Sequence, residues 1–364
     1  MNRPQSSSNS KPESKSPDAP HSPASPPSSN TAPLWGRARH LLGWQGLTLR
    51  VPVEWNPGRV AGGRERGDLR IDDPDGARLE LRWETPKTEV NIEKTVENFV
   101  STLAKQAKKE KRPFTSLGDL SLVSKHKKGK NRATSFGWTS DNSGDAPCGY
   151  GVAWSCPDCK RVVVAHLLGQ NHEAPKRVER SVQEILGSLD CDGHGGWDTW
   201  AAFELALDVP DEFPVARSQM LVSRLDLEWI RPRPIGLYGW GRRAERLRVQ
   251  RFPVAGVLLE GKPLSEWADW NIAFKNKALS LSRREEEKAS VNGHEALVYR
   301  GPVRDPRARI SILFFDLILR RKTPHTRVLV WQCEQSNRIF AFESEMSLVN
   351  EGIPDDVLES LACH

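Results

Sequence analysis

The sequence predicts an α+β fold of two tandem domains, each an antiparallel β-sheet flanked by helices. Three observations support this. The stretch from Gly151 to His166 returns in altered form from Val328 to Glu343. Runs that alternate apolar and polar residues, separated by turn residues, indicate hairpins in both copies. Each copy also holds two stretches with helical spacing, and the order of elements differs from the βαβ alternation of parallel sheets.

The repeated stretch is the clearest sign of a duplication. In both copies an apolar run contains Trp-x-Cys, four turn-like residues follow, and an Arg precedes a second apolar run. Each copy later closes on a further cysteine, in ILGSLDC and in VLESLAC. The aligned pairs are Trp154 and Trp331, Cys156 and Cys333, Arg161 and Arg338, and Cys191 and Cys363.

The length and composition indicate a tail followed by two domains. A chain of 364 residues gives a prior of two domains. Residues 1–34 contain ten Ser and eight Pro. Because such a segment cannot bury enough apolar surface to offset its ordering entropy, we expect a disordered tail there. The first repeat is then expected at 35–191, a linker at 192–200 and the second repeat at 201–364.

The first copy is predicted to run from strand to closing helix in a fixed order. Residues 47–51 alternate as a half-buried strand does, and residues 92–107 carry an apolar stripe at helical spacing, with Asn91 as its N-cap. The other expected elements are an amphipathic lead-in at 35–44, strands at 68–71 and 79–83, a hairpin within 120–138, the repeated hairpin at 151–166 and a closing helix at 178–189.

The second copy is predicted to repeat this order with one addition. The run RISILFFDLILRR at 309–321 is typical of a buried strand and has no counterpart in the first copy. The remaining elements are strands at 203–209 and 226–229, a helix at 264–274, a hairpin within 279–301, the repeated hairpin at 328–343 and a short closing helix that begins near Pro354.

This order of elements resembles the PsbP/DcrB-like superfamily, which includes the Mog-type proteins. The resemblance covers nearly the whole chain after residue 45. It implies an α/β/α sandwich around an antiparallel sheet and a binding or scaffolding role. The segments that carry it are VPVEW (51–55), ENFVSTLAK (97–105), GKNRATSF (129–136), RVVVAH (161–166) and VERSVQEILGSL (178–189), with VPDEF (209–213), LSEWADW (264–270), GHEALVY (293–299), RIFAFE (338–343) and DVLESL (356–361) in the second copy.

Cysteines are the strongest candidates for chemistry. Cys156 and Cys159 form a CxxC in a hairpin turn, which directs two thiolates to one point. Cys191 and His194 lie beyond the closing helix and would complete a Cys₃His tetrahedron for zinc. A redox pair is disfavoured, because the thioredoxin-type CxxC lies at a helix N-terminus within a βαβ unit.

The second copy keeps only part of this set. Cys333, Cys363 and His364 are retained, but the turn carries Gln335 and Asn337, so metal is not expected to be held there in the same way. Two other interpretations of the cysteines stay open: small buried side chains, or a disulfide within each repeat. The two structural pairs would be Cys156 with Cys191 and Cys333 with Cys363.

A basic stretch offers an alternative binding surface. Residues 105–132 contain ten Lys and Arg against two acidic residues. Such a patch can contact phosphates, although a run of charges usually only solvates a surface. The basic residues are Lys105, Lys108, Lys109, Lys111, Arg112, Lys125, Lys127, Lys128, Lys130 and Arg132.

The remaining features favour a non-enzymatic, cytoplasmic protein. HExxH, Walker and paired-carboxylate motifs are absent, and the histidines at 126, 166, 172, 294 and 325 are scattered. The chain shows no signal peptide and no membrane-length apolar run, and six cysteines are too few for a disulfide scaffold. We expect an unidentified protein partner and an interaction or scaffolding role. The alternatives are a zinc-binding or redox-responsive module and an anionic-surface or nucleic-acid binder.

Overall fold

The computed structural model describes residues 38–117, 120, 122, 133–140, 148–169, 175–191, 195–221, 224–235, 241–274, 283–302, 325–346 and 350–363. By its contacts the chain divides into two units, Met1–Ala32 and Pro33–His364, and every described residue belongs to the second. The tail expected at 1–34, the strand expected at 309–321 and the charged turn at 123–132 lie outside the described residues.

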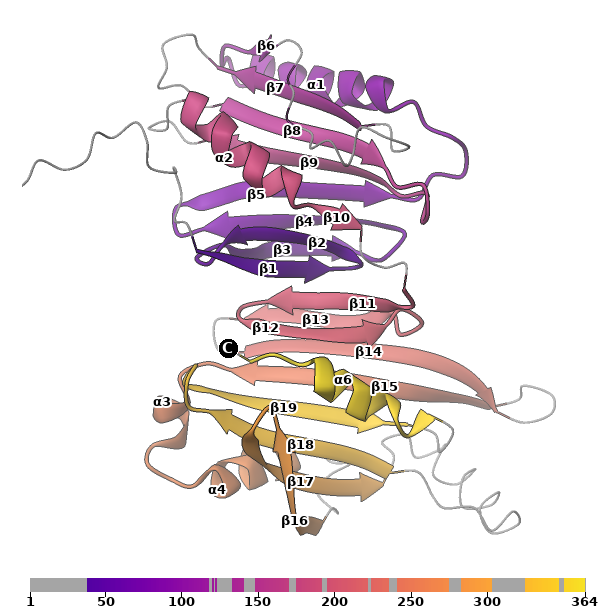
Figure 1. The fold of residues 1–364 in the computed structure, drawn as a ribbon, viewed down its shortest axis with the longest axis vertical. Helices are drawn as coiled ribbons and strands as arrows, with labels where there is room; N and C mark the ends of the chain where they lie inside the picture. Colours follow the sequence, from indigo (N-terminus) through magenta and orange to yellow (C-terminus); the bar gives the residue numbers. More distant parts are fainter. Residues whose placement is uncertain are drawn as a thin grey trace, which may run out of the picture. The chain divides into compact units, whose positions relative to one another are not determined.

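Two seven-stranded antiparallel sheets repeat one strand order (Figure 1). The shared order agrees with the duplication indicated by the aligned hairpins. The first sheet consists of β3 (Asn56–Gly62), β4 (Arg66–Asp73), β5 (Gly76–Glu84), β9 (Val162–Gly169), β8 (Cys148–Ser155), β7 (Ala133–Thr139) and β6 (Thr115–Leu117). The second consists of β13 (Val215–Leu221), β14 (Arg224–Ile235), β15 (Gly241–Phe252), β19 (Arg338–Glu345), β18 (His325–Cys333), β17 (His294–Pro302) and β16 (Arg283–Val291).

A third, five-stranded sheet takes strands from both copies. Its order is β10 (Asp190–Cys191), β2 (Leu47–Pro52), β1 (Arg39–Trp44), β11 (Trp197–Ala202) and β12 (Leu205–Pro210). β1 meets β11 antiparallel at Gly43 and Ala201. The sequence interpretation had placed an amphipathic lead-in and a linker where β1 and β11 lie.

The predicted α/β/α sandwich is wrong, because strands cover much of the sheet surface that was assigned to helices. The described chain is mostly β-strand in three antiparallel sheets, with few helices. Leu42 of β1 and Leu49 of β2 share a buried core with Leu69 of β4 and Leu81 of β5. Here one sheet packs on another, at a place where the sequence predicts a layer of helices.

The described helices cover only parts of the sheets. α1 (Ile92–Lys109) begins as predicted, with the Asn91 side chain accepting from the Lys94 N–H at 2.7 Å. Where one helix was expected at 264–274, the chain forms two short pieces. The other helical segments are α2 (Pro175–Gly187), α3 (Ala255–Leu259), α4 (Leu264–Ala268), a π-helical stretch at Asp269–Phe274 and α6 (Ile353–Ser360). None of the described helices is long and apolar enough to cross a membrane.

The closing helix of each copy is fixed to the five-stranded sheet in the same way. Ser188 Oγ accepts from the Arg50 N–H at 2.9 Å, and Ser360 Oγ accepts from the Asp208 N–H at 2.9 Å. Ser188 follows the last residue of α2 and Ser360 is the last residue of α6, and each lies three residues before a cysteine. The two terminal cysteines therefore reach equivalent positions beside the repeated hairpins.

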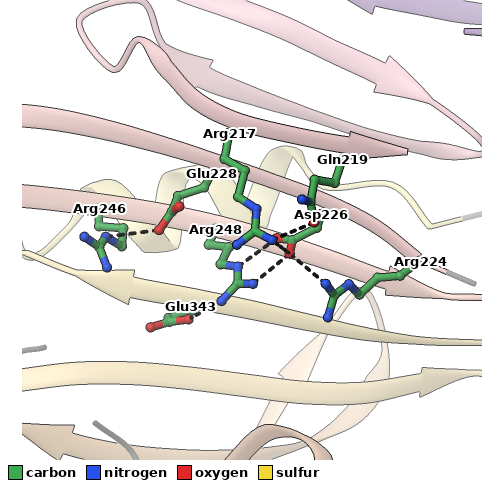
Figure 2. Close-up of polar contacts among 8 residues, drawn as sticks. All are labelled: Arg217, Gln219, Arg224, Asp226, Glu228, Arg246, Arg248 and Glu343. Carbon is green, nitrogen blue, oxygen red and sulfur yellow. Dashed lines mark hydrogen bonds and ion pairs between the residues drawn. The ribbon is translucent and has the colours of Figure 1, made fainter. Parts of the chain in front are cut away.

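A buried cluster of charges joins four strands of the second sheet. Figure 2 shows Asp226 of β14 accepting two hydrogen bonds from Arg248 of β15, each at 2.7 Å. Arg224 and Arg217 approach the same carboxylate at 3.5 Å and 4.0 Å. Burial opposes ionisation of Asp226, but the hydrogen bonds and charges of these arginines outweigh it and hold the pKa of Asp226 below its ordinary value.

Candidate metal centres

The hairpin turn between β8 and β9 positions two sulfurs in the first repeat. The Cys156 N–H donates to the Arg161 carbonyl at 2.8 Å and closes the loop. Lys160 adopts a left-handed φ of 58°, which completes the chain reversal. Cys156 is buried, at 4% exposed, and Cys159 is half-buried. The turn therefore shields one thiol and leaves the other near the surface.

The segment after α2 supplies a third sulfur. β10 pairs antiparallel with β2, and Cys191 lies opposite Leu47. Its side chain is 8% exposed. This strand is short, but the Ser188 contact with β2 fixes its approach. Cys191 is thereby directed at the hairpin turn from a separate part of the chain.

Cys156, Cys159 and Cys191 converge as the sequence predicts. Their sulfurs all lie within 4.8 Å of one another, and Cys159 Sγ is 3.3 Å from Cys191 Sγ. That separation is well beyond a covalent S–S bond of about 2.05 Å. Two thiolates on a tetrahedral zinc, with Zn–S of about 2.3 Å, lie roughly 3.8 Å apart. Small outward movements would therefore fit the three sulfurs to one ion. His194, the predicted fourth ligand, lies outside the described residues.

The surroundings of the three sulfurs favour a thiolate at Cys159. Hydrogen bonds from Cys156 and Cys191 lower the pKa of Cys159, and the backbone N–H and charge of Arg161 add to this effect. Hydrogen bonds with Cys156 and Cys159, together with burial, raise the pKa of Cys191. A metal ion that binds these sulfurs as thiolates would displace their protons.

A second group forms in the second repeat, with a different composition. One ligand atom from each of His294, Cys333 and Cys363 lies within 4.8 Å of the others. Both cysteines are fully buried. Burial and the neighbouring Cys333 raise the pKa of Cys363 to about 11. The structural pairs expected from sequence, Cys156 with Cys191 and Cys333 with Cys363, are thus each brought together.

His294 is the site residue that sequence reasoning missed. It was one of several scattered histidines, and the signal that identifies it is strand register. Ala296 of β17 pairs with Trp331 of β18. Continuing this register by two residues along each strand brings His294 beside Cys333. This proximity cannot be seen in the linear sequence, because the two positions are 39 residues apart.

The basic stretch is only partly described. Lys105, Lys108, Lys109, Lys111 and Arg112 are exposed at the end of α1 and just beyond it. Arg112 pairs with Glu110 through hydrogen bonds. The remaining five basic residues, Lys125, Lys127, Lys128, Lys130 and Arg132, lie outside the described residues.

A cavity of about 890 Å³ lies between α1 and the first sheet, with His166 in its wall. His166 Nε2 accepts a hydrogen bond from Trp138 Nε1 at 2.9 Å, so the neutral ring carries its proton on Nδ1. Burial, with the charge of Arg82, lowers the pKa of His166 to about 3. This histidine is a buried polar partner of Trp138.

The fold and sites define a duplicated, mostly antiparallel β protein with a group of cysteine or cysteine and histidine side chains in each copy that could hold a metal ion. Comparison with models of known protein families and with curated proteins finds no match for this chain. The resemblance to the PsbP/DcrB-like superfamily therefore stays a prediction.

Proposed function

We propose that the protein is a zinc-binding protein whose first repeat holds the ion through Cys156, Cys159 and Cys191. One observation carries the proposal: three sulfurs from two distant segments converge within 4.8 Å. Thiolates are soft ligands, and a sulfur-rich tetrahedral set is typical of zinc. His194 is the fourth ligand that the sequence offers.

The other interpretations of the cysteines account for less of this geometry. A disulfide can join only two sulfurs, so it would leave the third thiol beside the bond. Small buried side chains require apolar surroundings but no convergence of thiols. Cys159 is half-buried, and its sulfur lies 3.3 Å from that of Cys191. A shared metal ion uses all three sulfurs.

The role that we propose for the ion is structural. It would join the β8–β9 turn to the segment after α2, and so anchor a helix to the sheet it covers. Because a metal that binds only the folded chain stabilises it, the binding free energy appears as folding free energy. A chelator should then lower the melting temperature.

The test compares Cys159→Ser with Cys148→Ala, a cysteine of β8 outside the group. We expect Cys159→Ser to bind one zinc ion fewer per chain than the wild type, measured by elemental analysis. A chelator should also lower the melting temperature of this variant by less than that of the wild type. Cys148→Ala should keep its full zinc content. Unchanged zinc in Cys159→Ser, with the protein folded, would overturn the proposal.

The other expectations stay predictions. An interaction or scaffolding role, a cytoplasmic location and the lack of enzymatic activity are compatible with a structural zinc site but do not follow from it. A search for a protein partner should begin by substituting exposed apolar side chains. Among the described residues these include Val254, Val257, Leu258 and Trp270. A nucleic-acid role would require binding that weakens steeply with salt.

A further inference from the structure

The second repeat contains a ligand group that differs from the one expected from its sequence. We infer that it holds its own zinc ion, through His294, Cys333 and Cys363. The three ligand atoms lie within 4.8 Å of one another. This inference goes beyond the proposed function, because none of its ligands belongs to the first repeat.

The three ligands come from three separate segments: the β16–β17 turn, the end of β18 and the chain after α6. Hydrogen bonds hold the turn and the terminal segment in place independently of any ion. Asn292 Nδ2 donates to the Leu361 carbonyl and ties the turn to the terminal segment. Ala206 and Ala362 exchange two backbone hydrogen bonds, at 3.0 and 2.7 Å. Such support pre-organises a site, which lowers the cost of assembling it around a metal.

The turn geometry explains how His294 enters the group. Asn292 and Gly293 both have positive φ, 51° and 78°, as the two-residue turn of a tight hairpin requires. His294 follows immediately as the first residue of β17. Since β17 neighbours β18 in the sheet, His294 at the start of β17 lies next to the end of β18.

Comparison of the two copies shows an exchange of one ligand. Cys333 and Cys363 occupy the places of Cys156 and Cys191, while Ser336 stands where the first repeat has Cys159. The third ligand is then supplied by the adjacent hairpin instead of by the same turn. Two ligand positions are thus constant, and a three-ligand group is present in both copies.

Charge accounts for the difference between the ligand sets. Zn²⁺ with three thiolates carries a net charge of −1 (2 − 3), and the buried Arg161 acts on Cys159 with its positive charge. Zn²⁺ with two thiolates and a neutral imidazole is uncharged (2 − 2). In that copy the corresponding Arg338 is paired with Glu204. The first set therefore leaves a negative charge that Arg161 compensates, whereas the second set needs no such partner, since a buried charge is stable when it is compensated.

The two sites should also differ in their preference among metals. Three thiolates make the first site softer than the second, in which an imidazole replaces one sulfur. Cobalt(II), which substitutes for zinc in tetrahedral sites, reports this through the intensity of its thiolate charge-transfer absorption per ion. The full-length chain can therefore be tested with cobalt as the probe and zinc as the competitor.

The experiment uses the full chain and the variants His294→Ala, His294→Cys, Cys159→Ser and the double variant Cys159→Ser/His294→Ala. We expect the wild type to bind two ions, each single Ala or Ser variant one, and the double variant none. His294→Cys should keep two ions and increase the thiolate–cobalt absorption. That rescue separates ligation from a merely structural role of His294.

The outcomes keep this inference and the proposed function apart. If the wild type binds one ion and Cys159→Ser abolishes it, the first site stands and the second is overturned. If His294→Ala abolishes a single bound ion while Cys159→Ser does not, the second site stands and the first falls. Full zinc content in a folded His294→Ala variant would overturn the inference directly.

Discussion

Arg161 and Arg338 show how one aligned residue performs the same task with different partners. Arg161 Nη1 donates to the Gln45 carbonyl at 2.7 Å, in the turn between β1 and β2. Arg338 forms an ion pair with Glu204, in the turn between β11 and β12. Each arginine thus joins the repeated hairpin to the first hairpin of its copy. The sequence repeat identifies the arginine, but the partner depends on turns that the sequence did not reveal.

The buried His166 leads to a prediction about the stability of the protein in acid. Its pKa of about 3 lies below the ordinary value of 6.5. The unfolded state therefore takes up a proton first, so this group's stabilisation is present above pH 6.5 and is lost as the pH falls towards the folded pKa. At pH 5 the loss is about 2 kcal/mol.

Substitution of this histidine tests the sign. His166→Gln keeps an acceptor for Trp138 and removes the titration. We expect the free energy of unfolding of the wild type to fall more steeply than that of the variant between pH 6.5 and pH 5, in denaturant titrations. Equal slopes in the two proteins would contradict the assignment of a neutral, buried His166.

Elements with strong local signals could be predicted from the sequence. Helix α1 follows from its apolar stripe and from Asn91, and the repeated hairpins follow from their alternation. Strand β1 was missed although its turn with β2 contains Gly46, and β11 was missed because its turn with β12 lacks the usual residues. Phe203 and Glu204 both adopt positive φ, 54° and 62°, which turns normally assign to Gly or Asn. Missing these strands led to the incorrect sandwich.

The sequence predicts only those site residues that recur in both copies or lie in the same turn as one that does. The recurring pair Cys156 and Cys191 indicated a contact between hairpin and closing segment, and Cys159 lay in the same turn. His294 could not be found from spacing, since its approach to Cys333 depends on the β17–β18 register. Register is set by pairing across the sheet and leaves little trace in a linear motif.

The charge cluster on β14 and β15 gives a prediction for these elements. Asp226→Asn removes the carboxylate charge and leaves Arg248 with the more distant carboxylate of Glu343, at 3.6 Å. Because breaking a buried pair is costly, we expect a loss of about 3 kcal/mol at pH 7, measured by denaturant unfolding. Glu266→Gln, in the exposed pair with Lys262, is the matched control and should have little effect.

The pH dependence of that loss provides a second check. The pKa of Asp226 is lowered in the folded state, so its stabilisation is present above the unfolded value of about 3.9 and is lost as the pH falls through the folded pKa. The wild type and Asp226→Asn should therefore converge in stability in strong acid. A difference that persists unchanged there would argue against an ionised Asp226.

At the scale of the molecule, the two copies share a strand order and each brings soft ligands to one point. The ligands lie at the junction of a repeated hairpin with the segment after a closing helix. A metal at this junction would link parts of the chain that are distant in sequence. The duplication thus preserves a location where such side chains converge, while their composition differs between copies.

The most direct test of this account is anomalous X-ray scattering at the zinc absorption edge, from crystals of the full-length protein purified with zinc. We expect one peak within bonding distance of Cys156, Cys159 and Cys191, and a second at His294, Cys333 and Cys363. A first group that shows no anomalous peak, with a covalent bond between Cys159 and Cys191 in its place, would contradict the central claim.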